Sequence, residues 1–483
     1  MAHYNIPDNA WHGYTPQDKI VGQTLNSLLK YSGLTIKQLQ EQGVFVFPPI
    51  HKDVDVDNHV FSLNKATENC TFYTNNVVGF IGIGDVQLNI CSRFDDYKDN
   101  KLNNNFLTYM IARAAGLNVN LVNLESKGAN SSVFNLLELF FPRLLKDALS
   151  QGIYKEYKRV EYNDSRVKGP IDISRHIHKN IPFNGKIAYH AREYSMDNKV
   201  TQLIRHTIEY IRNSKGQFKA ILTNDPETTV AVQKLCNLTP MYNSMERRRI
   251  VKENQQNKVS HPYYTKYRIL QDLCLKILQG KKASWGNSKE KVYGVLIDAA
   301  WLWEEYIAKV LLDNKDGLKL KHYIREGEDY RLFKKDGHEF QQIIPDYYDE
   351  ENKVVADAKY IPLHRFDHLN ADRACAVYYK TLMYMLRFDC SNGLLLHPCS
   401  LEDVKQDLES SENYDENTDS VSRNQSVVYN TYEILQPEGS GKKLNLHKVG
   451  LIIANEENYS KFVIEMRERE TEFVEKIKEL LKK

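Results

Sequence analysis

Two aspartates and a lysine in one short stretch have the types and spacing found in metal-dependent hydrolases. Asp346 follows Ile343-Ile344-Pro345, and Asp357 and Lys359 lie two residues apart in a second apolar run. β-Branched and aromatic residues flank the acidic turn between the two runs, which predicts a β-hairpin. Side chains alternate faces along a strand, so Asp357 and Lys359 point the same way, and the hairpin can bring Asp346 beside Asp357.

Such a cluster could bind one Mg²⁺ ion, or Mn²⁺ in its place. Mg²⁺ retains several waters and is held by one or two carboxylates together with phosphate oxygens of the substrate. A lysine next to the metal can orient or deprotonate a water aimed at phosphorus. The sequence therefore predicts that Asp346 and Asp357 bind the metal and that Lys359 aligns the attacking water.

The same Asp-x-Lys spacing also occurs in ordinary solvated turns. Other copies stand in polar stretches of this chain, at Asp96–Lys98, Asp99–Lys101, Asp197–Lys199 and Asp313–Lys315. Asp357 instead interrupts the apolar strand Val354-Val355-Ala356. A carboxylate buried in such a strand is strongly destabilising unless something pairs with it. A metal ion and Lys359 are natural partners, and this setting separates Asp357 from the other copies.

Composition limits the classes of protein that fit. The chain has 483 residues and a net charge of only +2, so a nucleic acid would have to meet a local basic surface. Seven cysteines without a Cys-x-x-Cys pair argue against a zinc ribbon or a disulfide framework, and they suit a reducing compartment. We see no signal peptide and no apolar run of about 18 residues, so we expect a soluble cytoplasmic protein.

Three regions are expected along the chain. Residues 1–115 contain short strands punctuated by Gly, Asn and Asp, which predicts a β-rich N-terminal domain. Residues 116–284 have mainly helical periodicity, with a β insertion near residues 164–195. Residues 285–483 predict a mixed sheet flanked by helices, and within them residues 402–425 read as a mobile acidic loop. The fold class is therefore a multidomain α+β or α/β protein.

The order of elements around the acidic hairpin resembles the PD-(D/E)xK nuclease fold, which is typical of restriction endonucleases. We expect one helix over residues 296–313, carrying Glu304 ahead of the hairpin. The resemblance implies that the carbonyl of Ala358 binds Mg²⁺ together with the two acids and that Glu304 assists. One departure concerns the Gln-x-x-x-Tyr motif of RecB-like members. The same spacing here gives Lys380 and Tyr384, so Lys380 is not assigned the glutamine's role.

Four segments in chain order extend the resemblance. They are residues 88–94, residues 152–157 with 167–172, residues 197–198 and residues 296–307. Together they resemble the McrC family, the nuclease subunits of McrBC-type 5-methylcytosine and LlaJI-like restriction systems. Two departures are visible, because Cys91-Ser92-Arg93 stands where the family has Pro-Lys and Lys168 stands where it has Arg.

This resemblance implies a division of labour within an anti-phage restriction complex. The N-terminal region would dock on a hexameric McrB-like AAA+ GTPase and stimulate its GTP hydrolysis. The partner would recognise and translocate double-stranded DNA, methylated or not, and this chain would cut it. The sequence agrees in one respect, because it contains no Walker motif with which to bind GTP itself.

Two other functions fit the same residues. The chain could be a non-catalytic assembly and GTPase-activating subunit whose acidic pair only braces a core lysine, or a stand-alone repair-type nuclease. His364 and His368 could suggest zinc, but Asp367 would not share their helix face, so a loop near DNA phosphates is favoured. For the cluster at residues 247–249, a solvated helix end is favoured over a phosphate contact.

Overall fold

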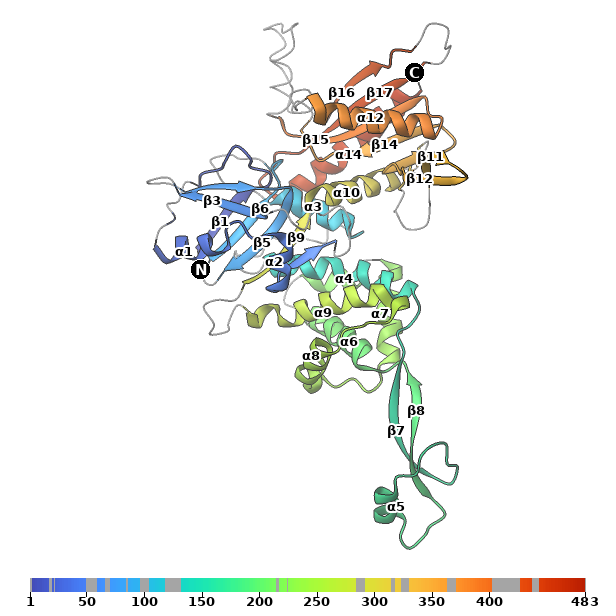
Figure 1. Ribbon diagram of the computed structural model, residues 1–483. Coiled ribbons are helices and arrows are strands. Elements are labelled where there is room, and N and C mark those ends of the chain that lie inside the picture. The colour runs from blue at the N-terminus through green and yellow to red at the C-terminus, as the bar shows by residue number, and fades with distance from the viewer. Residues whose placement is uncertain are drawn as a thin grey trace. The chain divides into compact units, whose positions relative to one another are not determined.

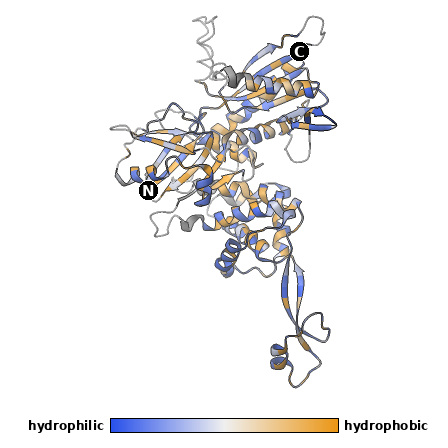
Figure 2. Cartoon of the chain, viewed as in Figure 1, coloured by the Kyte–Doolittle hydropathy of each residue, from blue (hydrophilic) through white to orange (hydrophobic). Residues whose placement is uncertain are grey.

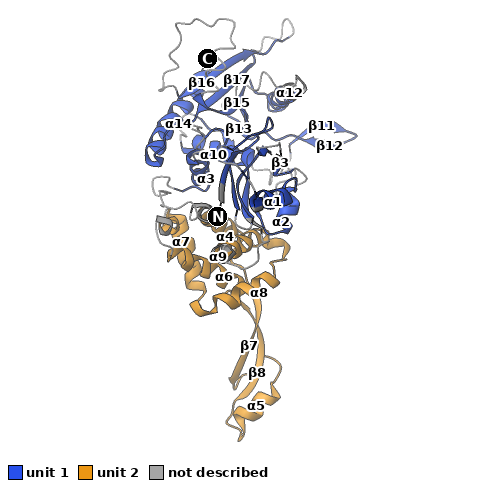
Figure 3. Ribbon diagram, turned by 90° about the vertical axis from the view of Figure 1, so that its left-hand side faces the viewer, with its two compact units in different colours: residues 1–127, 287–483 blue, residues 128–286 orange. Residues whose placement is uncertain are grey.

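The protein is described by a computed structural model that divides into two compact units. Unit 1 comprises residues 1–127 and 287–483, and unit 2 comprises residues 128–286 (Figure 3). The structure describes residues 2–16, 20, 22–48, 59–65, 70–83, 86–95, 104–117, 132–213, 217–223, 225–283, 292–313, 318–322, 330–362, 371–401, 426–436 and 443–482. Among these residues, no helix is long and apolar enough to cross a membrane.

Unit 1 contains a five-stranded sheet built mainly from the N-terminal part of the chain (Figure 1). Its strand order is β1 (Ala2–Pro7), β6 (Val86–Cys91), β5 (Val77–Ile83), β9 (Val292–Asp298) and β2 (Phe45–Phe47). A core of buried apolar side chains joins this sheet to α1 (Gly22–Tyr31), α2 (Ile36–Glu41) and the small sheet of β3 (Phe61–Lys65) and β4 (Cys70–Thr74). Buried apolar side chains therefore hold this sheet, the two helices and the small sheet together in one core.

Strand β9 differs from the sequence-based expectation of one helix over residues 296–313. It pairs antiparallel with β5 and parallel with β2, which places it inside the N-terminal sheet although it follows residue 285. Helix α10 (Ala299–Asp313) begins after it, where Asp298 accepts a hydrogen bond from the Trp301 amide at 2.8 Å. The short apolar run before Asp298 suits either element, because periodicity alone cannot separate a buried strand from a helix.

A second, six-stranded mixed sheet carries the acidic hairpin. Its strand order is β10 (Lys321–His322), β13 (Tyr347–Asp349), β14 (Val354–Ala358), β15 (Asn392–Cys399), β17 (Asn445–Ile452) and β16 (Val427–Glu433). β13 and β14 are antiparallel, whereas β14, β15 and β17 are parallel neighbours. The predicted hairpin and the mixed α/β architecture are therefore confirmed.

Helices pack against this sheet and tie it to the rest of unit 1. Helix α12 (Ala371–Arg387) crosses between β14 and β15, and its Tyr384 packs with Val355 in a buried cluster. Helices α10 and α14 (Tyr459–Leu481) pack against β14 and β17 respectively. A further ribbon of β11 (Arg331–Lys335) and β12 (His338–Gln342) forms a separate two-stranded sheet.

Unit 2 is a helical body with a long antiparallel arm. Its helices are α4 (Ser132–Ser150), α6 (Lys199–Arg212), α7 (Pro226–Leu238), α8 (Arg247–Gln256) and α9 (Thr265–Ala283). The β character expected near residues 164–195 belongs to β7 (Glu156–Asp164) and β8 (Ile187–Ser195), which pair along their full length, with α5 (Ile173–Asn180) between them. The arm strands are mainly hydrophilic, unlike the sheet strands of unit 1 (Figure 2).

Candidate metal centre

The β13–β14 hairpin brings Asp346 and Asp357 together. Tyr347 pairs with Ala356, so Asp346 comes opposite Asp357 one position further along the ladder. The Asp346 Oδ2 atom accepts a hydrogen bond of 2.8 Å from the Ala358 amide, which fixes the first carboxylate against the second strand. Asp357 has no solvent exposure and Asp346 is half-buried. The hairpin therefore places two carboxylates side by side.

Asp349 ends β13 at the hairpin turn and is not part of the Asp346–Asp357 pair. Its carboxylate accepts hydrogen bonds from the amides of Glu351 and Asn352 at 3.0 Å and of Lys319 at 2.9 Å. Burial opposes its charge, but these hydrogen bonds outweigh burial and lower the pKa of Asp349. Asp349 is therefore a buried acid whose oxygens are already occupied.

Lys359 is the cation closest to the acidic pair. Its Nζ atom lies 2.5 Å from Asp357 Oδ2, and its amide donates to Leu396 O at 2.8 Å, which extends the pairing with β15. Among the described residues, neither carboxylate oxygen of Asp357 has a hydrogen bond of good geometry. A fully buried carboxylate with a single ion pair is only partly compensated, and a divalent cation would complete it.

The two aspartates have opposite proton affinities. Burial raises the pKa of Asp346 well above its usual range, and the charges of Asp357 and Glu304 raise it further. Burial also opposes the charge on Asp357, but Lys359, Asp346 and Lys380 outweigh it and lower the pKa of Asp357 to about 2. Without a metal, the surroundings therefore favour the neutral form of Asp346 and the charged form of Asp357, and a bound cation would favour the charged form of both.

Glu304 reaches the same place from α10. Its Oε1 atom lies 2.9 Å from His322 Nε2 on β10, and its backbone oxygen accepts a hydrogen bond of 2.5 Å from the Tyr347 hydroxyl. Its charge acts on Asp346, so it lies near the acidic pair as expected. His322 could not be selected from the sequence, because its contact with Glu304 depends on the pairing of β10 with β13.

Lys380 lies level with Asp357. Helix α12 links two parallel strands, so it runs antiparallel to β14. Tyr384 packs with Val355 in the buried cluster. Lys380 lies four residues before Tyr384, about 6 Å along the helix, and Asp357 lies two residues after Val355, a similar distance along the strand. The charge of Lys380 also acts on Asp357. Lys380 is therefore a second cation near Asp357, on the α12 side.

Two further polar residues are buried on the neighbouring strands. His397 Nδ1 lies 3.0 Å from Ile361 O, and burial lowers the pKa of His397 to about 4, so its ring is neutral. Lys448 has no solvent exposure, and its Nζ atom lies 5.1 Å from the ring centroids of both Tyr378 and Tyr432. A charge interrupting an apolar strand could have identified Lys448 from the sequence, as it identified Asp357.

The donor set fits Mg²⁺ or Mn²⁺ better than zinc. Within the described residues, no group of three or more His, Cys, Asp or Glu side chains has the arrangement of a preformed metal site. Two carboxylates with a backbone carbonyl suit Mg²⁺, which keeps waters and uses substrate oxygens. The two Asp357 oxygens fit a bound metal ion, because among the described residues they accept no hydrogen bond of good geometry. His364, His368 and the acidic loop at residues 402–425 lie outside the described residues.

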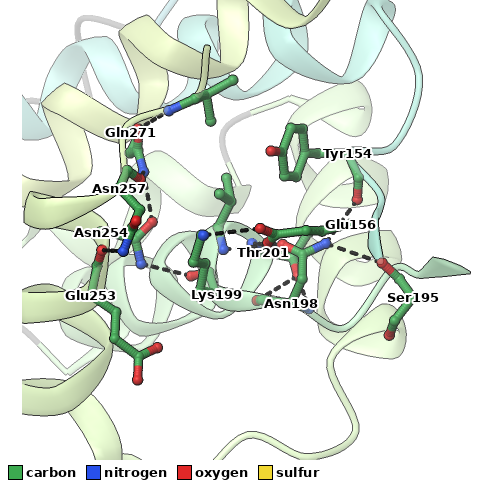
Figure 4. Close-up of polar contacts among 12 residues, drawn as sticks. Tyr154, Glu156, Ser195, Asn198, Lys199, Thr201, Glu253, Asn254, Asn257 and Gln271 are labelled. Carbon is green, nitrogen blue, oxygen red and sulfur yellow. Dashed lines mark hydrogen bonds and ion pairs between the residues drawn. The ribbon is translucent and has the colours of Figure 1, made fainter. Parts of the chain in front are cut away.

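Unit 2 contains a cleft of about 430 Å³ at the root of the arm (Figure 4). Charges of both signs line it, but they neutralise one another: Lys199 pairs with Glu156 at 2.9 Å, and Arg249 pairs with Glu246 and Glu253. The basic cluster at residues 247–249 thus begins helix α8, and its Arg249 is engaged within the protein. The cleft is held by its own ion pairs and gives no sign of a ligand.

The fold and the acidic hairpin define a multidomain α/β protein with a buried oxygen-donor site. A family model described as "McrBC 5-methylcytosine restriction system component" matches residues 73–398, more than half of the chain. The chain therefore belongs to this family, and the resemblance drawn from the sequence is confirmed. Among curated proteins, none is similar enough to match.

Two solved structures are similar at low sequence identity. A half-complex of Thermococcus gammatolerans McrB AAA+ hexamers with bound McrC is 16% identical, with a TM-score of 0.43, over 96% of this chain and 99% of that chain. The cryo-EM structure of the Thermococcus gammatolerans McrBC complex is 15% identical, with a TM-score of 0.31, over 65% of this chain and 88% of that chain.

Proposed function

We propose that this chain is the DNA-cutting subunit of a McrBC-type restriction complex and hydrolyses phosphodiester bonds with Mg²⁺ or Mn²⁺. The observation that carries the proposal is the fully buried Asp357 carboxylate, which lies beside Asp346 and has Lys359 Nζ 2.5 Å from its Oδ2 atom. A purely structural acid would resemble Asp349, whose oxygens accept several hydrogen bonds. Family membership supports the same assignment.

Each residue would have a distinct role in the hydrolysis. Asp346, Asp357 and the carbonyl of Ala358 would hold the metal, which supplies charge stabilisation at the scissile phosphate. Lys359 orients the attacking water, because its ammonium already lies at the metal-facing carboxylate. Glu304, held by His322, supports the metal side of the pair. The assignment of the domain that carries the acidic hairpin to the PD-(D/E)xK nucleases is part of this proposal.

Lys380 would add a second positive charge on the α12 side of Asp357. The charge of Lys380 acts on the Asp357 carboxylate, and its own position in the helix is exposed. An exposed ammonium next to the acids can reach a phosphate oxygen of bound DNA without the cost of burying a charge. This role differs from that of the neutral Gln found at the same spacing in RecB-like nucleases.

We further propose that the chain docks on a McrB-like AAA+ GTPase hexamer, which would recognise and move along double-stranded DNA. The resemblance to McrC implies docking through residues 1–115, and that assignment stays a prediction. The arm of unit 2 offers a second surface, because large apolar side chains are exposed around α5 at its tip: Ile173 (70%), Ile177 (51%), Ile181 (66%) and Phe183 (68%). Exposed apolar clusters of this kind mark protein contacts.

The buried ion pair of Asp357 and Lys359 also fits a non-catalytic assembly subunit in which the acids only brace the lysine. Cleavage of labelled DNA separates the two functions. The purified chain is combined with the product of the adjacent reading frame as the candidate GTPase, with GTP, and with methylated or unmethylated duplex DNA. We expect cutting with Mg²⁺ or Mn²⁺ and none in EDTA, because the acid pair needs a metal to polarise the phosphate.

Cutting that persists in EDTA would contradict the metal-dependent mechanism. Cutting that never exceeds background with every component present would favour the assembly subunit. Cutting at full rate without the GTPase and GTP would favour a stand-alone nuclease. The exposed acid Glu350 of the same hairpin supplies the control, since Glu350→Gln should cut at the parent's rate.

A further inference from the structure

The β11–β12 ribbon is exposed along most of its length. Residues 333–342 are all exposed, and the ribbon stands clear of the six-stranded sheet in Figures 1 and 3. Its turn is Asp336-Gly337, with φ angles of 51° and 83°, which are the values that a tight type I′ hairpin turn requires. An isolated two-stranded ribbon is marginally stable in water, so its exposed side chains need a reason.

One face of the ribbon is aromatic and basic. Phe333 pairs with Phe340, and Lys335 pairs with His338, so these four side chains share a face. The two rings lie 5.6 Å apart and are 51% and 48% exposed. Glu339 pairs with Lys334 on the opposite face, and Asp336 is in the turn. The acidic residues of the ribbon are thus kept away from the aromatic face.

The base of the ribbon is anchored next to the acidic pair. The Ile343 amide donates to Tyr330 O at 2.9 Å, and Arg387 Nε on α12 donates to Arg331 O at 2.7 Å. The Tyr330 ring lies 5.0 Å from the ring of Phe388. β12 ends at Gln342, and Asp346 follows within four residues. The ribbon is therefore joined to β13 by a connection of four residues, 343–346, the last of which is Asp346.

We propose that this face of the ribbon binds duplex DNA beside the cut site, a surface that rests on the proposed nuclease function. Lys335 and His338 would meet backbone phosphates, and the Phe333–Phe340 pair would press into a groove against sugars and base edges. Aromatic or apolar side chains inserted in this way commonly widen or kink the duplex. A five-residue strand spans about 17 Å, which corresponds to roughly five base pairs of duplex.

Fluorescence anisotropy of a labelled duplex measures DNA binding by the full chain and tests the proposal. Binding is measured in EDTA, with the chain alone and with the chain together with its GTPase partner. Phe333→Ala/Phe340→Ala should weaken binding about 10-fold or more, because aromatic contacts with nucleic acid contribute strongly. Lys335→Ala should lower the salt dependence of log Kd by about one unit, as expected for the loss of one phosphate contact. Ile464→Ala, at an exposed apolar position on α14, is the matched control and should bind like the parent.

The outcomes separate this inference from the proposed function. If the parent cuts DNA and the ribbon variants bind it as tightly as the parent, the ribbon assignment is wrong and the nuclease assignment stands. If the variants bind DNA normally but lose the GTPase, the ribbon is a protein contact and the inference is overturned. If the parent neither binds nor cuts DNA, the proposed function fails first. Should the double variant unfold, Lys335→Glu tests the same face and should weaken binding by at least about 10-fold.

Discussion

Asp346 and Asp357 lie side by side, yet the protein treats their charges in opposite ways. Burial and two neighbouring carboxylates raise the pKa of Asp346, whereas Lys359 and Lys380 overcome burial and lower the pKa of Asp357 to about 2. The neutral form of Asp346 and the charged form of Asp357 are therefore the forms that stabilise the metal-free fold. This asymmetry suits a site that releases one proton when it binds a cation.

Removing each charge should therefore change stability in opposite directions when EDTA keeps the site metal-free. The raised pKa of Asp346 means that its contribution is present at low pH and is lost as the pH rises through the folded value. Asp346→Asn should raise the thermal midpoint at pH 8, by roughly 2 to 4 °C, and by less at pH 5.

Asp357→Asn should instead lower the midpoint at pH 8 by a similar or larger amount. The lowered pKa of Asp357 means that its contribution is present above pH 4 and is lost as the pH falls toward about 2, so the difference from the parent should shrink in acid. Thermal unfolding from pH 3 to pH 9 measures both variants. Midpoints that move in the same direction for the two variants would show that the pair does not share a single proton.

For single residues, the sequence predicts contacts within one hairpin better than contacts between strands that are far apart in the chain. Asp346, Asp357 and Lys359 could be placed together because the two-residue period of a strand and a short turn determine their faces. His322 and Lys448 could not, since their positions depend on how β10 and β17 join the sheet. Lys380 could be selected by its spacing from Tyr384, but its alignment with Asp357 required the packing of α12.

Among the elements, the arm of unit 2 is held at its root by one asparagine. Asn198 Oδ1 caps α6 by accepting from the Val200 and Thr201 amides at 3.0 and 3.2 Å. Asn198 Nδ2 donates to Tyr154 O at 3.1 Å and to Ser195 O at 3.2 Å, so the same side chain binds both strands of the arm where they enter (Figure 4). The helix start and the arm root thus form one structural unit.

Asn198→Ala should destabilise unit 2 by about 2 kcal/mol, because it removes a helix N-cap together with the hydrogen bonds to Tyr154 O and Ser195 O. Asn213→Ala is the matched control. It removes one hydrogen bond, to Glu209 O, from an exposed residue at the other end of α6, and should cost no more than about 0.5 kcal/mol. Hydrogen exchange at the roots of β7 and β8 measures the effect. Equal protection in the two variants would refute this role of Asn198.

Element types followed from the sequence for the long helices and for the short N-terminal strands, and the prediction was wrong where a short apolar strand runs directly into a helix. The 19-residue helix α4 has an apolar pattern that only a helix fits. Strand β9 was mistaken for the start of α10 because its buried run is brief and its pairing partners lie more than 200 residues earlier in the chain. Gly79 lies where β5 meets β9: its φ is +133°, and a Cβ there would lie 2.1 Å from Val295 O, so the close approach of the two strands requires glycine.

Across unit 1, one buried polar cluster joins the N-terminal sheet region to the region that carries the acidic hairpin. Glu470 on α14 accepts from the Tyr109 and Tyr306 hydroxyls at 2.7 and 2.9 Å and pairs with Arg113 at 2.9 Å. Tyr109 and Arg113 belong to α3 (Asn105–Ala114), and Tyr306 belongs to α10. The cluster spans more than 350 residues of sequence and joins helices from both chain segments of unit 1, residues 1–127 and 287–483.

The claim that this chain's own acid pair cuts the DNA is tested by a separation-of-function variant. Asp357→Ala and the control Asp349→Asn are each assembled with the GTPase, GTP and Mg²⁺, and DNA cleavage and GTP hydrolysis are measured in the same reaction. Asp357→Ala should lose cleavage by at least about 100-fold while GTP hydrolysis persists, and Asp349→Asn should keep both. Cleavage by Asp357→Ala at the parent's rate would contradict the claim.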